Sequence, residues 1–203
     1  MDEAFEKGAV KRCASELSRA IWYYRAWKAL QEVERHNSAN FIHLAELAMG
    51  DQMITHATKV LSINVTNGKF EEGGFWALYK SRQCDVDLIC LRLGVCLDPI
   101  RKVGASLKLI RDKTHFHLDR EGVLNPKFIW QEANITHDQF DIALSTTFAI
   151  IGELHFLING TAYEAWQYDG SDAKLIAQHA DQHDLLFRER HSAPAGWPEQ
   201  FGD

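Results

Sequence analysis

The sequence contains few of the residues that interrupt helices. Only 4 of its 203 residues are proline and 13 are glycine, and both are sparse through most of the chain. Proline and glycine have the poorest helix propensities, so their scarcity is typical of a protein built from long helices.

Cysteine is scarce as well, with four in the chain. Cys84, Cys90 and Cys96 are spaced six residues apart, and on one helix this spacing distributes them around the circumference. They would then share neither a metal ion nor a disulfide partner, which agrees with a reducing compartment. We expect the cysteines to be small core residues.

The chain also lacks a long uninterrupted hydrophobic run. Its longest apolar stretch, residues 146–158, contains Glu153 and His155 and is too short to span a bilayer. The acidic first residues show no secretory-signal pattern, so we expect a cytoplasmic protein without membrane contact. A formal net charge of −6 excludes a general nucleic-acid-binding surface.

The hydrophobic content of 46% allows one good-sized core, and a single domain is the natural count. Residues 1–191 are predicted to form an all-α bundle of about five to six helices, and residues 192–203 a Pro- and Gly-containing tail. Spacing and capping signals, among them a capping box at Thr136 and Gln139, place the helices at about 3–35, 38–64, 75–97, 98–120, 136–160 and 171–190. Phe128 and Trp130 suggest that the connection before residue 136 packs on the bundle.

The fourth predicted helix has clear local signals. The Asp98 carboxylate can cap its first turn, Pro99 loses no hydrogen bond there, and Gly122 can close the helix. An apolar stripe at helical spacing is expected to face the core, and it consists of Ile100, Val103, Leu107, Ile110, Thr114 and Leu118. Arg111 borders this stripe on one side and His117 on the other, so both are drawn towards the packed side.

A charged motif occupies the end of this helix. Arg111, Asp112 and Lys113 are followed, after a short gap, by His117 and Asp119. The pattern resembles the signature of the HEPN superfamily of helical-bundle proteins, an Arg followed by a polar residue and then a His. It is most similar to the AbiU-type branch, which is associated with abortive infection of phage-infected bacteria. The resemblance covers roughly residues 35–160 and implies a HEPN-like bundle.

The resemblance also implies a metal-independent endoribonuclease that needs no cofactor. His117 is the candidate catalytic base, since an imidazole with a pKa of about 6.5 suits proton transfer near neutrality. Arg111 offers a planar fork of donors for the charge that develops on the phosphate. His115, on the same face as Arg111 in a straight helix, is a competitor and an auxiliary residue, as is Asp112. The candidate phosphate- and RNA-binding residues, which share a positive charge, are Lys108, Lys113 and Arg120.

A second apolar line, Ala105, Leu109 and Phe116, runs along the opposite face of the same helix. It suggests a homodimer, and in the HEPN family the cleft lies between two protomers, the second of which supplies another histidine. RNA is the implied substrate, and an antitoxin or another protein is a further implied partner, in phage defence or a toxin–antitoxin system. The rival explanation is that Leu109 and Phe116 pack within one chain, under the connection that contains Phe128 and Trp130.

Two other functions compete with cleavage. Phe116 stands where the AbiU-type pattern has a small residue, and a bulky side chain there can fill the pocket of a non-catalytic module that binds RNA or a protein. His179 and His183 have the i, i+4 spacing that can place two imidazoles on a metal ion. Because no third ligand is identifiable, these two histidines are expected to be surface residues and no metal site is expected.

Overall fold

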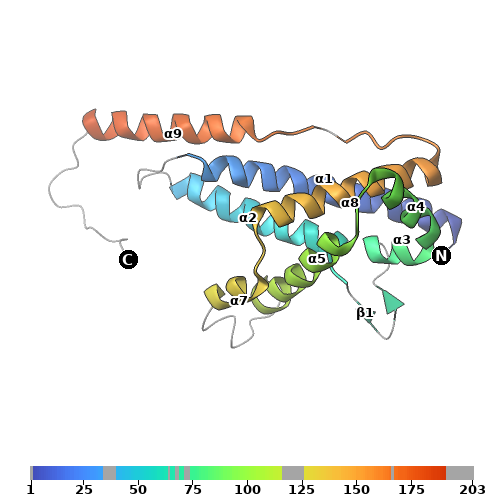
Figure 1. The fold of residues 1–203 in the computed structure, drawn as a ribbon. Coiled ribbons are helices and arrows are strands. Elements are labelled where there is room, and N and C mark those ends of the chain that lie inside the picture. Colours follow the sequence, from blue (N-terminus) through green and yellow to red (C-terminus); the bar gives the residue numbers. More distant parts are fainter. Residues whose placement is uncertain are drawn as a thin grey trace.

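The longest helices of the computed structural model pack side by side (Figure 1). The structure describes residues 2–33, 40–63, 65–66, 69–70, 74–115, 126–165 and 167–190. α1 (Glu3–Gln31) and α2 (Asn40–Leu61) are antiparallel neighbours, because Glu16 contacts His56 while Trp27 lies against Gly50.

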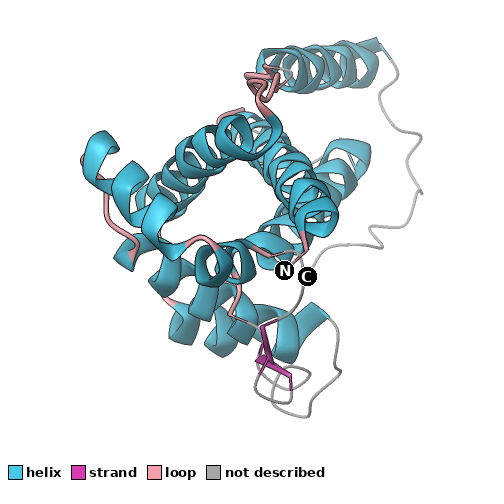
Figure 2. Cartoon of the chain, turned by 90° about the vertical axis from the view of Figure 1, so that its right-hand side faces the viewer, coloured by secondary structure: helices cyan, strands magenta, loops and turns pink. Residues whose placement is uncertain are grey.

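The other elements follow in chain order. They are the strands β1 (Val65–Thr66) and β2 (Lys69–Phe70), the helices α3 (Phe75–Ser81), α4 (Gln83–Leu93) and α5 (Asp98–Ile110), the π-helical turn η1 (Arg111–His115), and the helices α7 (Pro126–Ala133), α8 (His137–Asn159) and α9 (Ser171–Arg190). The two short antiparallel strands lie at the edge of the molecule (Figure 2). The fold is an all-α helical bundle, as predicted, and its described part has eight α-helices where the sequence suggests five to six.

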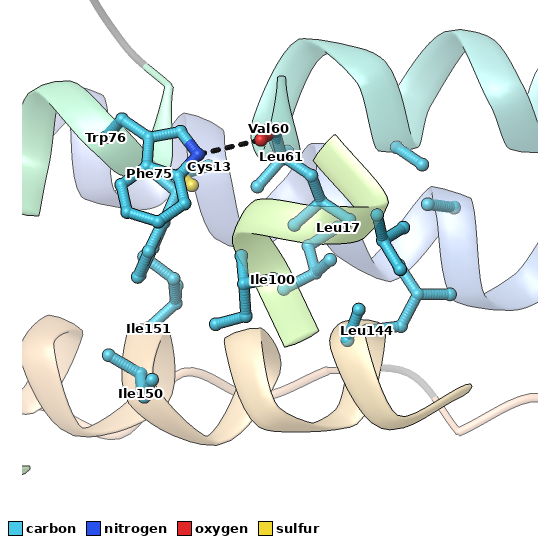
Figure 3. Close-up of a cluster of buried hydrophobic side chains, with 14 of the residues drawn as sticks. Cys13, Leu17, Val60, Leu61, Phe75, Trp76, Ile100, Leu144, Ile150 and Ile151 are labelled. Atoms are coloured by element: carbon cyan, nitrogen blue, oxygen red, sulfur yellow. Dashed lines mark hydrogen bonds between the residues drawn. The ribbon is translucent and has the colours of Figure 1, made fainter. Parts of the chain in front are cut away.

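The main hydrophobic core lies between α1, α2, α5 and α8, and α3 closes one end of it (Figure 3). Trp76 of α3 donates a hydrogen bond from Nε1 to the Leu61 carbonyl oxygen, at 2.8 Å. Carbonyls in the last turn of a helix have no hydrogen-bond partner within the helix, so the indole of Trp76 supplies the donor for the last carbonyl of α2. Large side chains that are fully buried include Leu17, Phe75, Ile100, Leu107, Leu144 and Ile150.

α5 meets α2 at Gly104, where two backbones come into contact. A Cβ atom at this position would lie 2.1 Å from the Leu61 carbonyl oxygen and 2.9 Å from its carbon. Such distances are shorter than any van der Waals contact, so the close approach requires glycine. Gly104 therefore sets the depth at which α5 packs on α2.

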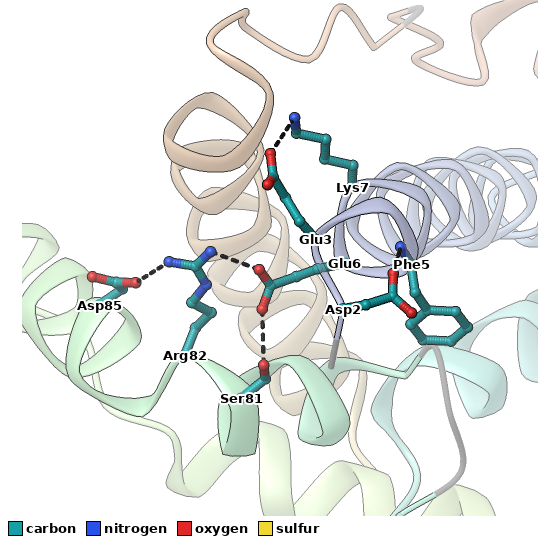
Figure 4. A network of polar contacts seen from close by, with 8 residues as sticks. All are labelled: Asp2, Glu3, Phe5, Glu6, Lys7, Ser81, Arg82 and Asp85. Atoms are coloured by element: carbon teal, nitrogen blue, oxygen red, sulfur yellow. Dashed lines mark hydrogen bonds and ion pairs between the residues drawn. The ribbon is translucent and has the colours of Figure 1, made fainter.

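The helix predicted at residues 75–97 is two helices that separate at Arg82, so that prediction is wrong. Arg82 has φ −126° and ψ 40°, which is outside the helical range. Its Nη2 donates to the buried carboxylate of Glu6 at 2.6 Å, and Ser81 Oγ donates to the other Glu6 oxygen at 2.8 Å (Figure 4). The break directs both side chains at the first turns of α1.

The Glu6 contacts are expected to make the fold sensitive to acid. The hydrogen bond from Arg82 lowers the pKa of Glu6 from its usual 4.5, although burial raises it. The unfolded chain then takes up the proton more readily, so the stabilisation is present above about pH 4.5 and is lost as the pH falls further. Glu6→Gln should lower the free energy of unfolding by about 1.5 kcal/mol at pH 7.

Urea titrations at pH 7 and at steps below pH 5 measure this effect. The difference between Glu6→Gln and the natural protein should shrink as the pH falls. Glu3→Gln, which removes an exposed carboxylate 2.7 Å from Lys7 Nζ, is the control and should have a smaller effect. A Glu6→Gln deficit that stays constant with pH would contradict the assignment.

Two predicted helix starts have different outcomes. The capping box is confirmed, because Thr136 Oγ1 accepts from the Gln139 amide at 3.2 Å and the Gln139 side chain accepts from the Thr136 amide at 3.2 Å. The predicted cap at Asp98 is wrong, since Asp98 is already inside α5 and its side chain makes no capping bond. The Asp98 carboxylate instead lies 3.6 Å from the Arg101 guanidinium.

The connection before α8 contains α7, which packs on the bundle by other residues than expected. Ile129 is fully buried, whereas 44% of Phe128 and 45% of Trp130 remain exposed. Ser106 of α5 also donates to the Ala133 carbonyl at 2.6 Å. α7 is thus attached to α5 through its inner face, and its two aromatic side chains lie at the rim.

The cysteines divide between core and surface. Cys13 and Cys90 are buried, while Cys84 and Cys96 are exposed, so the prediction of core positions is right for two and wrong for two. Within α4 the spacing of six residues places Cys84 and Cys90 on different faces, and Cys96 lies beyond the end of that helix. Burial raises the pKa of the Cys13 thiol to about 12, which keeps it protonated and unreactive.

α8 is the one helix of the described residues that is long and apolar enough to cross a membrane by length and composition. It has 23 residues, more than the stretch recognised in the sequence, because its helix begins at His137. In the bundle it packs against α1, α4 and α5. The core helix of a helical bundle passes the same test of length and composition.

Candidate functional site

The candidate site begins where α5 continues into the π-helical turn η1. Four residues of the predicted apolar stripe are buried, as expected: Ile100, Val103, Leu107 and Ile110. The side chains of the remaining two, Thr114 and Leu118, lie outside the described residues. α5 is thus anchored on the core up to the residue that directly precedes Arg111.

Arg111 is half-buried and is held by its neighbour in the chain. Its Nε and Nη2 atoms lie 2.7 and 2.6 Å from Oδ1 of Asp112, and 24% of its side chain is exposed. The ion pair uses two of the five N–H donors of the guanidinium and restricts its orientation. The other donors have the geometry to bind phosphate oxygens.

The π-helical turn interrupts the α-helical spacing between Arg111 and His115. In a straight α-helix His115 would lie on the same face as Arg111. A π-helix bonds residue i to residue i+5, so η1 departs from the four-residue spacing that would place His115 over Arg111. His115 ends the described π-turn, although its side chain, like Phe116, His117 and Asp119, lies outside the described residues.

The predicted phosphate-binding residues divide in a similar way. Lys108 and Lys113 are both partly buried, on α5 and η1, while Arg120 lies outside the described residues. Within the described part, two lysines therefore flank the Arg111–Asp112 pair along the chain. Their charges would add to the guanidinium in attracting a phosphate backbone.

The second apolar line on α5 does not form one surface in the described residues. Ala105 is exposed, but Leu109 is partly buried and packs against the main core. Phe116 lies outside the described residues. Leu109 is apolar because it packs against the core of its own chain, and it therefore gives no support to a dimer. The proposal of a dimer depends on the family resemblance.

The described residues contain no group of three or more side chains that could hold a metal ion. His179 is exposed on α9, as expected for a surface residue, and the side chain of His183 lies outside the described part. The pair by itself gives no support to a metal enzyme.

A second polar cluster, which the sequence does not reveal, lies between α1 and α2. Glu16 is 3% exposed, and its Oε2 lies 2.5 Å from Nδ1 of the buried His56. Three cations surround the same carboxylate: Arg12 Nε at 2.8 Å, Lys59 Nζ at 3.4 Å and Arg19 Nη1 at 3.8 Å. One buried negative charge is thus shared by three partly exposed positive ones.

The Glu16 carboxylate is ionised at neutral pH. Burial acts to raise its pKa, but the hydrogen bond from His56 and the nearby charges of Lys59 and Arg12 lower it by more, so the pKa lies below its usual value. An ionised carboxylate can only accept a hydrogen bond, so His56 Nδ1 is the donor. The signal in the sequence is a charged residue among the buried positions of a helix, since Cys13 and Leu17 flank Glu16 in the core.

No family model, curated protein or solved structure matches this chain. The resemblance to the HEPN superfamily therefore remains a prediction from the motif at residues 111–119. The function must be argued from the residues themselves.

Proposed function

We propose that the protein is a metal-independent endoribonuclease of the HEPN type, acting in phage defence or as the toxin of a toxin–antitoxin pair. The observation that carries this proposal is the Arg111 guanidinium, fixed by Asp112 at 2.6–2.7 Å in a π-helical turn, six residues before His117 in the chain. π-turns within helices occur frequently at functional sites. A pre-oriented cation is also what stabilisation of a charged transition state requires.

In the proposed reaction, His117 removes the proton from a ribose 2′-hydroxyl. The 2′-oxygen then attacks the adjacent phosphorus, and the bond from phosphorus to the 5′-oxygen breaks. Arg111 donates to the non-bridging oxygens as their negative charge grows, while a second imidazole, from the partner protomer of a homodimer, protonates the leaving oxygen. The products are a 2′,3′-cyclic phosphate and a 5′-hydroxyl end.

This mechanism predicts cleavage that does not depend on metal ions. Purified protein should cut single-stranded RNA in excess EDTA, at a rate within about twofold of that with Mg²⁺, because imidazole and guanidinium supply all the catalytic groups. Mass spectrometry of the products should find the cyclic phosphate. Activity that disappears with EDTA and returns with Zn²⁺ or Mn²⁺ would overturn the proposal.

The second candidate is a non-catalytic module that binds RNA or a protein partner through the same face. The Arg111–Asp112 ion pair favours it over catalysis, because a guanidinium that is partly neutralised can still contact a ligand but stabilises less of the charge that develops in a transition state. The two candidates differ in the same assay. A binding module retains RNA in a filter or mobility experiment but releases no cyclic phosphate.

A further inference from the structure

A cavity of about 300 Å³ opens at the surface between α1 and α2, beside the Glu16 cluster. Its lining is mostly apolar, and three of the lining residues are aromatic. The lining residues are Arg19, Trp22, Tyr23, Ala26, Met49 and Tyr168. The volume is at the lower end of the range for small-molecule pockets, which suits a single aromatic ring system better than a larger ligand.

Arg19 connects this cavity to the charged cluster. It lines the cavity, and its Nη1 is 3.8 Å from Glu16 Oε1. Arg12 and Lys59 contact the same carboxylate, so three positive charges meet one negative charge. Between 48% and 68% of each of these cationic side chains is exposed. The cluster beside the cavity therefore carries an excess of positive charge that is accessible to an anion, and Arg19 brings part of it into the cavity wall.

The buried pair also fixes one wall of the cavity. The ring of His56 stacks on Tyr23 with a centroid distance of 5.5 Å and an interplanar angle of 6°. Because Glu16 holds His56 at 2.5 Å, the Tyr23 ring is held in turn. An aromatic wall that is already ordered loses little side-chain entropy when a ring binds against it.

We propose that this cavity binds one nucleotide, with the base among Trp22, Tyr23 and Tyr168 and the phosphate on Arg19, Arg12 and Lys59. Aromatic side chains stack on any base, since every base has a π-face. Guanidinium groups form charge-assisted hydrogen bonds with phosphate oxygens. The nucleotide is either a free mononucleotide or an unpaired nucleotide of an RNA strand. The proposal does not depend on cleavage at Arg111.

Isothermal titration of the full chain with AMP, UMP, adenosine, ribose 5-phosphate and inorganic phosphate tests the chemistry. AMP should bind at least about tenfold more tightly than adenosine and than ribose 5-phosphate, because only AMP uses both halves of the site. A second arm compares a single-stranded oligoadenylate with an RNA duplex. Binding of the single strand without binding of AMP assigns the site to RNA, provided that the variants below weaken it.

Arg19→Gln should weaken AMP about tenfold and leave adenosine unchanged, whereas Trp22→Leu should weaken both about tenfold. Met49→Glu adds a negative charge to the α2 wall of the cavity and should weaken AMP binding by a similar factor. Because this variant leaves α1 unchanged, it controls for repacking of α1. Lys102→Gln, on exposed α5 surface, is the matched charge control and should change nothing. The proposal is overturned if neither AMP nor the single strand binds better than inorganic phosphate, or if Lys102→Gln weakens binding as much as Arg19→Gln does.

Discussion

His117→Ala is expected to lower RNA cleavage about 100-fold or more, the usual scale for loss of a general acid–base group. Imidazole is the side chain of this motif whose ordinary pKa, about 6.5, suits proton transfer near neutral pH. The rate should be measured with a fluorescent RNA at pH 7. Circular dichroism should find unchanged helical content in the variant.

His115→Ala is the matched comparison for this variant, two residues away. We expect it to cost less, because the resemblance to the HEPN pattern aligns His117, and not His115, with the catalytic histidine. A larger loss from His115→Ala than from His117→Ala would assign the base to His115. It would also show that the alignment with the HEPN pattern is displaced by one or two residues.

Gly104→Ala is expected to lower the free energy of unfolding by about 3 kcal/mol, at the upper end of the range for overpacking. The added methyl group would meet the Leu61 carbonyl at 2.1 Å. This obstacle is backbone, so no side chain can move aside to relieve it. Chemical denaturation followed by circular dichroism measures the change.

Gly152→Ala supplies the control, since Gly152 also lies within a helix but has no atom within 4 Å of the added methyl. Alanine has the higher helix propensity, so this variant should be more stable by about 0.5–1 kcal/mol. The two identical substitutions should thus have opposite signs. A gain in stability from both would contradict the close approach of α5 to α2.

The features predicted correctly are those that neighbours in the chain determine. The buried stripe from Ile100 to Ile110 follows from helical periodicity, and the Thr136–Gln139 capping box uses groups three residues apart. The break at Arg82 and the missing cap at Asp98 were not predictable in this way. Arg82 takes a non-helical conformation and contacts Glu6, which lies 76 residues earlier in the chain.

The Glu16 cluster illustrates the same limit at a candidate binding site. Glu16 and His56 are 40 residues apart, and neither belongs to a recognisable motif. The sequence shows that Glu16 and His56 are each polar among apolar neighbours. It does not show that the two side chains contact each other. The Arg111 motif, by contrast, is continuous in the chain, so its residues could be named in advance while the conformation of the turn could not.

The contact at Leu61 has a mechanical consequence for the candidate site. α5 is held there near its middle, where Gly104 lies against the carbonyl and Trp76 bonds to the same oxygen. Arg101, one turn earlier on α5, has its guanidinium 5.5 Å from the Trp76 ring centre. About 10 Å of helix separates the contact at Gly104 from Arg111. A tilt of α5 by about 10° at this contact would therefore displace Arg111 by about 2 Å. A misplacement of about 1 Å in a catalytic site can lower the reaction rate about 100-fold.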